Sequence, residues 1–92
     1  MAAVEIEIVL YEGSGCGLCV RAAELLESEA PRLGFRLERI AIDGDEALEK
    51  RYRIDLPVVL VDGEIAFTQA VAAGPLQRAV ERAQAHRLEQ GS

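Results

Sequence analysis

The feature that most constrains this chain is a change of hydrophobic period across the segment GSGCG, residues 13–17. Before it, residues 4–11 alternate with a period of two, which predicts a β-strand. After it, apolar side chains recur at the spacing of one helix face. These are Cys19, Ala22, Ala23, Leu26, Ala30 and Leu33. A strand, a glycine-rich loop and a helix are therefore expected in that order, with two cysteines at the junction.

The next segment predicts a second strand and a short helix. Residues 35–42 read as a strand whose alternation slips, so we expect a bulge or a strand partly covered on both faces. Pro31 is expected to end the preceding helix or to disturb its last turn. Asp43 and Glu46 resemble a capping box, which favours a short helix over 45–53.

The last third predicts a hairpin and a helix. Strands over 56–61 and 64–67 are joined by Asp62-Gly63, because glycine accepts the positive φ that a type I′ turn requires. Pro75 is then well placed to open the final helix. The order is β-α-β-α-β-β-α, with a parallel first pair and an antiparallel hairpin. We predict one α/β domain over residues 1–92, a mixed four-stranded sheet flanked by helices.

Charge and composition exclude several classes of partner. The formal net charge of −6 disfavours nucleic acid and anionic membrane surfaces, both of which attract basic proteins. The first apolar run is interrupted by glutamates and has no basic segment before it, so we expect neither a signal peptide nor a membrane span. The expected compartment is the cytoplasm, where thiols stay reduced and a CxxC pair indicates chemistry or metal binding.

Cys16 and Cys19 are placed asymmetrically on the predicted helix. The free N–H groups and the dipole at its N-terminus should lower the pKa of the Cys16 thiol, and the flanking glycines should leave it accessible. Cys19 lies one turn further and should be more buried. This asymmetry suits thiol–disulfide exchange, with Cys16 as nucleophile and Cys19 as resolving thiol. Glu12 could raise the thiol pKa, and Arg21 could offset it.

Other interpretations of the cysteines and of the chain stay open. They could be two small buried structural residues. They could be half of a zinc site, although zinc usually takes four ligands, His86 is the only histidine, and a dimer would be needed to complete the site. The chain could also be a non-enzymatic binding module, or a dimer that binds a metal or cluster through Cys16.

The cysteine pair, the following helix and a proline opening the third strand resemble the thioredoxin fold, and more closely the small glutaredoxin-like proteins. The similar segments are 9–26, 41–64 and the final helix. The resemblance implies sheet order 2-1-3-4 and a cis Pro57 facing the cysteines. It implies reduction of protein disulfides or glutathione mixed disulfides by a monomer without a resident cofactor, with glutathione as a candidate reductant.

The resemblance also suggests further site residues. A substrate groove would comprise Tyr11, Gly17, Leu18, Leu56 and Pro57, although Tyr11 could equally pack in the core. Arg51, Arg53 and Thr68 are candidate glutathione contacts, although arginines on a short helix are usually solvated surface. Two positions depart from glutaredoxins: Gly17-Leu18 replaces their proline-aromatic pair, and Thr68-Gln69 stands where they have Gly-Gly.

Overall fold

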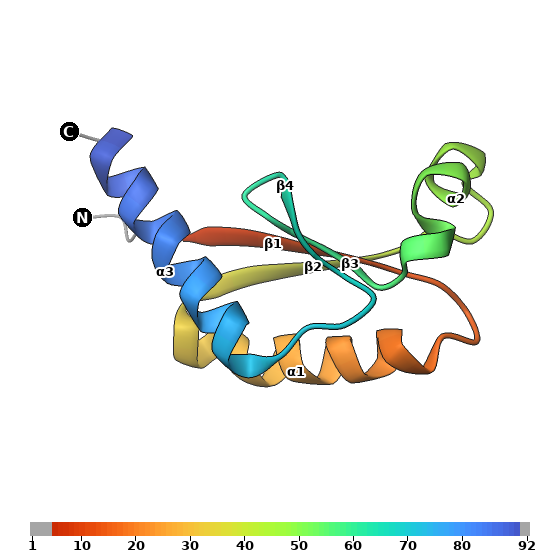
Figure 1. Ribbon diagram of the computed structural model, residues 1–92, viewed down its shortest axis with the longest axis horizontal. Coiled ribbons are helices and arrows are strands. Elements are labelled where there is room, and N and C mark those ends of the chain that lie inside the picture. The colour runs from red at the N-terminus through yellow and green to blue at the C-terminus, as the bar shows by residue number, and fades with distance from the viewer. Residues whose placement is uncertain (1–4, 91–92) are drawn as a thin grey trace.

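The computed structural model describes residues 5–90, which form a four-stranded sheet with helices on both of its faces (Figure 1). Val4, at the start of the predicted first strand, lies outside the described residues. The elements are β1 (Ile6–Glu12), α1 (Gly17–Leu33), β2 (Phe35–Ala41), α2 (Glu46–Tyr52), a 3₁₀ turn η1 (Arg53–Asp55), β3 (Val58–Val61), β4 (Glu64–Thr68) and α3 (Ala73–Gln90).

The sheet has the predicted topology, in the order β2-β1-β3-β4. β1 and β2 are parallel, and β3 is antiparallel to both of its neighbours, β1 and β4. Because parallel strands end at the same edge of a sheet, the loops that follow β1 and β2 meet at one end of the molecule. The β3–β4 turn lies toward the opposite end (Figure 1).

One face of the sheet packs on α1 and α3 and forms the main apolar core. Alternate strand residues point into it because successive side chains in a strand face opposite sides. Burying one valine, leucine or isoleucine side chain in such a core stabilises the fold by about 1.5–3 kcal/mol. The buried cluster comprises Ile6, Ile8, Leu10, Ala22, Ala23, Leu26, Phe35, Val59, Val61, Leu76, Ala79 and Val80.

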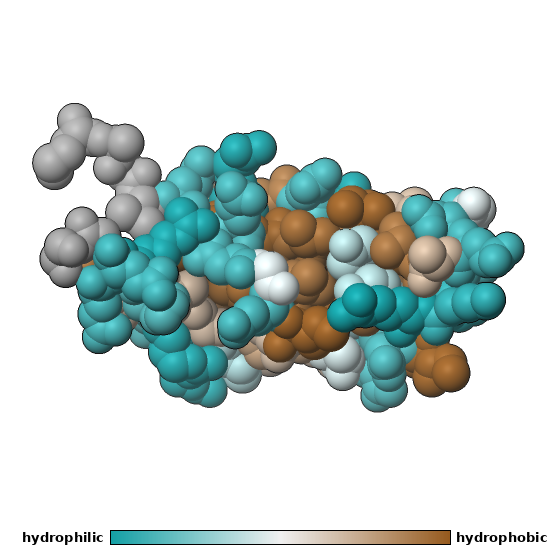
Figure 2. All heavy atoms as spheres, turned by 90° about the horizontal axis from the view of Figure 1, so that it is seen from above, coloured by the Kyte–Doolittle hydropathy of each residue, from teal (hydrophilic) through white to brown (hydrophobic). Residues whose placement is uncertain are grey.

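The other face of the sheet is covered only at one end. There α2 lies over the carboxyl end of β1, and Tyr52 stacks on Tyr11 with ring centroids 4.4 Å apart. Further along the same face, Val9 and Leu60 are half-buried and Ile65 is 51% exposed. Seen from this side, apolar residues gather in the middle of the molecule (Figure 2). The sheet thus has one closed face and one partly open face.

Pro31 does not end α1 but lies in its last turn, the second of the two outcomes expected for it, whereas the prediction that Pro75 opens the final helix was wrong in detail. α1 continues through Pro31 to Leu33, because a proline in the last turn removes one intrahelical hydrogen bond while Gly34 still closes the helix. Gly34 adopts φ 79°, and its N–H donates to the carbonyl of Ala30 at 2.8 Å. α3 begins at Ala73, two residues before Pro75, so that this proline lies in the first turn instead of opening it.

The predicted cap of α2 was also wrong. Asp45, not Asp43, is the N-cap, and its carboxylate accepts the N–H of Leu48 at 3.1 Å. In β2 the pairing with β1 runs without a bulge, while Leu37 and Ile40, on opposite faces, are both half-buried. The register shift lies instead in the hairpin, between Val59 and Leu60.

The hairpin turn follows the prediction. Asp62 and Gly63 have φ values of 50° and 86°, the left-handed conformation that both central residues of a type I′ turn adopt. No helix among the described residues combines the length and the apolar character needed to cross a lipid bilayer.

Candidate functional site

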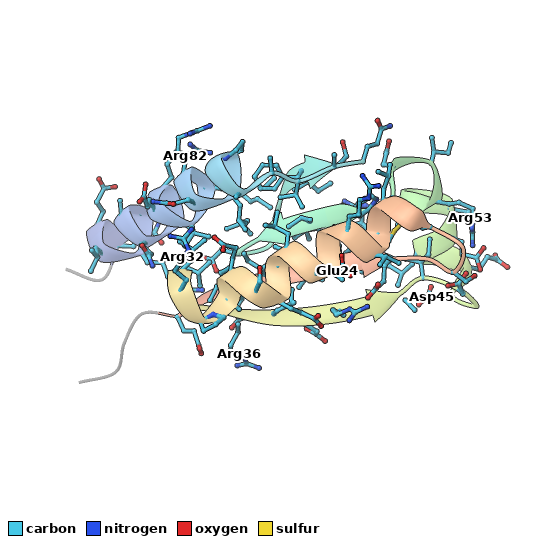
Figure 3. All side chains as sticks on the ribbon, turned by 90° about the horizontal axis from the view of Figure 1, so that it is seen from below. Glu24, Arg32, Arg36, Asp45, Arg53 and Arg82 are labelled. Atoms are coloured by element: carbon cyan, nitrogen blue, oxygen red, sulfur yellow. A yellow bond between two sulfur atoms is a disulfide. The ribbon has the colours of Figure 1, made fainter. Side chains whose placement is uncertain are left out.

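Cys16 caps the N-terminus of α1. Its backbone is extended, with φ −100° and ψ 100°, and its Sγ accepts the N–H of Cys19 at 3.1 Å. The Cα atoms of the two cysteines are 5.2 Å apart and their sulfur atoms form a disulfide, visible at the start of α1 (Figure 3). The spacing of three residues therefore brings both sulfurs to one side of the first turn.

The two cysteines differ in exposure as predicted. Cys19 is 1% exposed, whereas Cys16 is half-buried and is followed by exposed Gly17 and Leu18. No acidic residue lies in the first turn of α1. The positive end of the helix dipole thus acts on Cys16 without an opposing carboxylate from that turn.

The loop before Cys16 requires its glycines. Gly15 adopts φ 74°, which a glycine tolerates without steric cost. A Cβ on Gly13 would lie 2.8 Å from Cδ1 of Leu56, so the Leu56 side chain would have to shift to admit any other residue there. Leu56 therefore lies directly against the cysteine loop, and the Leu56-Pro57 peptide bond is cis, as the resemblance implied.

Ser14, between these two glycines, is bound by the carboxylate of Asp43. The backbone N–H of Ser14 donates to Oδ2 at 3.0 Å and its hydroxyl donates to Oδ1 at 3.1 Å. The N–H of Ser14, followed by its hydroxyl, holds the pKa of Asp43 below its ordinary value. The carboxylate that follows β2 is thus joined at two points to the loop that follows β1.

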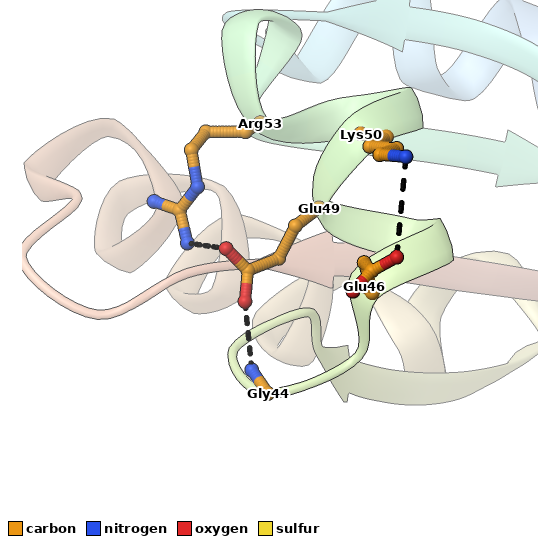
Figure 4. A pocket seen from close by; sticks show the side chains of 5 residues that line it. All are labelled: Gly44, Glu46, Glu49, Lys50 and Arg53. Atoms are coloured by element: carbon orange, nitrogen blue, oxygen red, sulfur yellow. Dashed lines mark hydrogen bonds and ion pairs between the residues drawn. The ribbon is translucent and has the colours of Figure 1, made fainter.

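Asp43 is in turn held by Arg53, the first residue of η1, which directly follows α2. Nη2 of Arg53 lies 3.4 Å from Oδ1 of Asp43 and 2.9 Å from Oε1 of Glu49. The second oxygen of Glu49 accepts the N–H of Gly44 at 2.9 Å (Figure 4). The Gly44 N–H, and after it Arg53, lowers the pKa of Glu49, while Glu49 raises that of Arg53. A hollow of ≈ 460 Å³ beside them is lined by Gly44, Glu46, Glu49, Lys50 and Arg53, and neither cysteine lines it.

Glu12 is neutralised by a residue other than the predicted Arg21. Arg39 of β2 donates to both of its carboxylate oxygens, at 2.7 and 2.9 Å, and also to Glu27 of α1 at 2.9 Å. These hydrogen bonds, with Glu12 first, raise the pKa of Arg39 further above its ordinary value. Arg21 itself is exposed. The carboxylate preceding the cysteine loop is therefore paired within the sheet.

The remaining predicted site residues are distributed around this end of the molecule. Tyr11 is half-buried beneath Tyr52, and the guanidinium of Arg51 lies 5.3 Å from the centroid of the Tyr52 ring. Thr68 is exposed at the end of β4. Gln69 adopts φ 70°, so the backbone keeps a glycine-like conformation where the resemblance implies a Gly-Gly pair.

Sequence reasoning missed Ser14, Asp43 and Arg39 as parts of the site. One signal was available for the first two: the predicted parallel pair brings the loops after both strands to one edge of the sheet, and each loop carries a hydrogen-bonding side chain. Among residues 5–90, no group of three or more His, Cys, Asp or Glu side chains could hold a metal ion.

Comparisons with known proteins agree on the fold. The family model described as glutaredoxin-like domain (DUF836) matches residues 7–90. The uncharacterized proteins Rv0508 of Mycobacterium tuberculosis and Mb0520 of Mycobacterium bovis are 37% identical over 62 residues, 62% of this chain and 64% of theirs. The chain thus spans less than two thirds of the length of these relatives.

Solved structures are similar over most of the chain. Protein Ne2328 from Nitrosomonas europaea has a TM-score of 0.71 at 23% identity, with 86% of this chain and 95% of that one covered. Fasciola hepatica thioredoxin gives 0.60 at 19%, covering 85% and 80%. Glutaredoxin 1 from Francisella tularensis gives 0.54 at 17%, covering 85% and 95%. At these identities the similarity establishes a thioredoxin-like fold.

Proposed function

Because this chain belongs to the glutaredoxin-like domain family, we propose that it is a thiol–disulfide oxidoreductase that reduces protein disulfides or glutathione mixed disulfides. The observation that carries the proposal is the Cys16–Cys19 disulfide at the N-terminus of α1, where the Sγ of Cys16 accepts a backbone N–H. An N–H donor and a helix dipole stabilise a thiolate at that position in the reduced protein.

In the proposed reaction, the Cys16 thiolate attacks one sulfur of a substrate disulfide. A mixed disulfide forms, the substrate S–S bond breaks, and the departing thiolate takes up a proton from solvent. Cys19 then loses its proton and attacks Sγ of Cys16, which releases the second substrate thiolate. Two electrons pass to the substrate, and the protein is left with the Cys16–Cys19 disulfide. Two molecules of glutathione, or one dithiol, would return it to the reduced form.

The half-buried Cys16 and the 1% exposed Cys19 suit these different roles. The nucleophile has to meet a substrate, whereas the resolving thiol has to meet only Cys16. We propose that the substrate lies along a groove formed by Tyr11, Gly17, Leu18, Leu56 and Pro57. The exposure of Gly17 and Leu18, and the position of the Leu56 side chain against Gly13 of the cysteine loop, support this groove.

For glutathione we propose contacts with Arg51, Arg53 and Thr68, all exposed. Arg53 already pairs with Asp43 and Glu49, so a glutathione carboxylate would compete with two protein carboxylates there. Arg51 and Thr68 are therefore the stronger candidates of the three.

The test compares two coupled assays on the same preparation. One follows disulfide reduction driven by glutathione and glutathione reductase, and the other follows reduction driven by thioredoxin reductase. Turnover in at least one assay is expected, and the active assay identifies the class of electron donor. Cys16→Ser should abolish turnover, whereas Cys19→Ser should accumulate mixed disulfides that a non-reducing gel detects.

A matched control is Ser28→Ala, which removes an exposed hydroxyl whose hydrogen bond, within residues 5–90, goes to the Leu25 carbonyl of the same helix. It should leave turnover unchanged. No turnover in either assay, together with binding of a partner that ignores both cysteine substitutions, would contradict the proposal and favour a non-enzymatic binding module.

A further inference from the structure

The loop Gly13–Gly15 leads directly into Cys16, yet a single residue, Ser14, carries its hydrogen bonds to the rest of the described chain. Within residues 5–90, its hydrogen bonds to other segments run from Ser14 to Asp43 and nowhere else. The glycines on either side, one of them with positive φ, leave the loop backbone intrinsically free. Apart from the bonds of Cys16 to α1 itself, the hydrogen bonds that hold this end of the loop in place are those of Ser14.

Asp43 can hold Ser14 in place because both of its carboxylate oxygens accept hydrogen bonds. One accepts the N–H of Ser14, and the other accepts the hydroxyl of Ser14 and faces Arg53. Arg53 is itself oriented by Glu49, which also binds the N–H of Gly44, next to Asp43. The hydrogen bonds thus run from Ser14 to Asp43, then through Arg53 to Glu49, and back to Gly44 beside Asp43. This network fixes the direction of the Asp43 carboxylate.

We propose that Asp43, oriented by Arg53, is a positioning residue for the thiol pair: its carboxylate anchors Ser14 and thereby holds Cys16 at the N-terminus of α1. This inference rests on the proposed function for its purpose, but it concerns the reduced Cys16 thiol and can be tested without a substrate. It also assigns Arg53 a role through Asp43, distinct from contact with glutathione.

Two physical effects of Asp43 oppose each other and make the inference testable. As a negative charge near the cysteine loop, it disfavours a thiolate, so that its removal alone would lower the pKa of the Cys16 thiol. As an anchor, it keeps the thiolate at the helix N-terminus, so that its removal would raise that pKa. The sign of the change distinguishes the two effects.

The experiment measures the rate of alkylation of the reduced full chain by iodoacetamide as a function of pH, with Cys16 identified as the modified residue by mass spectrometry. Asp43→Ala should raise the apparent thiol pKa by about 0.5, and slow alkylation about threefold at pH values below it. Asp43→Asn should raise it less, because its amide oxygen still accepts the Ser14 N–H.

The matched control is Asp45→Asn, which removes the same charge two residues away and keeps an N-cap side chain on α2. It should leave the thiol pKa unchanged. If Asp43→Ala does not fold, Ser14→Ala replaces it, because that variant removes the hydroxyl bond alone and should raise the pKa by a smaller amount.

An unchanged or lowered thiol pKa in Asp43→Ala, or in Ser14→Ala where the former is unfolded, overturns the inference. So does an equal rise in Asp45→Asn. Failure of the proposed function is a separate result, since it appears as absent turnover in the unmodified protein whatever the alkylation rates show.

Discussion

Two aspartates anchor opposite ends of the sheet in the same way and with different consequences. Asp62, after β3, accepts hydrogen bonds from the backbone N–H of Glu7 at 3.0 Å and from Nε and Nη2 of Arg87 at 2.8 and 2.6 Å. Asp43, after β2, accepts the N–H and hydroxyl of Ser14 and faces Arg53. Each joins a strand end, a neighbouring segment and a helix.

The difference lies in what is anchored. Asp62 joins two regular elements, β1 and α3, to a tight turn, and its side chain is 23% exposed beside the main core. Asp43 holds an irregular loop of glycines at the end of the sheet that α2 covers, and its side chain is 39% exposed. We infer that the first anchor serves the stability of the fold and the second serves the geometry of the cysteines.

The largest expected effect concerns the stacking of Tyr52 on Tyr11, at the end of the sheet where the cysteine loop lies. Tyr52 is 6% exposed and stacks on Tyr11, so Tyr52→Ala should lower the free energy of unfolding by about 3 kcal/mol. Tyr52→Phe keeps the ring and should cost less than about 1 kcal/mol. Urea unfolding of both variants measures this. Equal losses in the two variants would show that the ring does not hold α2 on the sheet.

A smaller effect is expected at the hairpin end. Asp62→Ala loses the Glu7 and Arg87 contacts and places alanine at φ 50°, so the free energy of unfolding should fall by about 2 kcal/mol. Asp62→Asn tolerates that φ and can still accept the Glu7 N–H, so its loss should be about half as large. The thermal unfolding temperatures of wild type, Asp62→Asn and Asp62→Ala should fall in that order.

The same two Asp62 variants also test whether the anchor at the hairpin end affects the reactivity of Cys16. Alkylation of Cys16 should proceed at the wild-type rate in both, because Asp62 lies at the other end of the sheet from the cysteine loop. A thiol pKa that moves in Asp62→Ala as it does in Asp43→Ala would remove the distinction between the two anchors.

The smallest effect is the contribution of the carboxylate charges to stability against acid. The hydrogen bond from Arg87 lowers the pKa of Asp62, and the N–H of Ser14 lowers that of Asp43. A lowered folded-state pKa stabilises the protein above the unfolded value of about 3.9, and this contribution disappears as pH falls through the folded values. Asp62→Asn should therefore be less stable than wild type at pH 6, and the difference in stability should shrink as the pH falls through the lowered pKa of Asp62. Unfolding midpoints at several pH values measure the difference in stability between wild type and Asp62→Asn. A difference that grows on acidification would contradict a lowered pKa of Asp62 in the folded protein.

Much of the fold was predictable because its signals are local. The alternation before residue 13 and the helical spacing after Cys19 each require only the next few residues to be known, and the Asp62-Gly63 pair specifies its own turn. The placement of Cys16 at a cap and Cys19 in the buried stripe follows from the same periodicity. Sheet order 2-1-3-4 came from the resemblance.

The anchors could not be predicted, because their partners are distant in sequence. Ser14 and Asp43 are separated by 29 residues, Glu12 and Arg39 by 27. Several acids and arginines could compete for each such pairing, and the sheet register decides among them. The cap of α2 failed for a related reason: Asp43 and Asp45 both suit an N-cap, and Asp43 is engaged by Ser14 instead.

The stacked tyrosines have a practical consequence for anyone studying the protein in solution. The chain contains no tryptophan and only two tyrosines, and those two rings lie on each other between β1 and α2. Tyrosine fluorescence and the tyrosine bands of near-ultraviolet circular dichroism therefore originate from a single spot. These signals therefore report, without any added label, whether α2 is packed on the sheet.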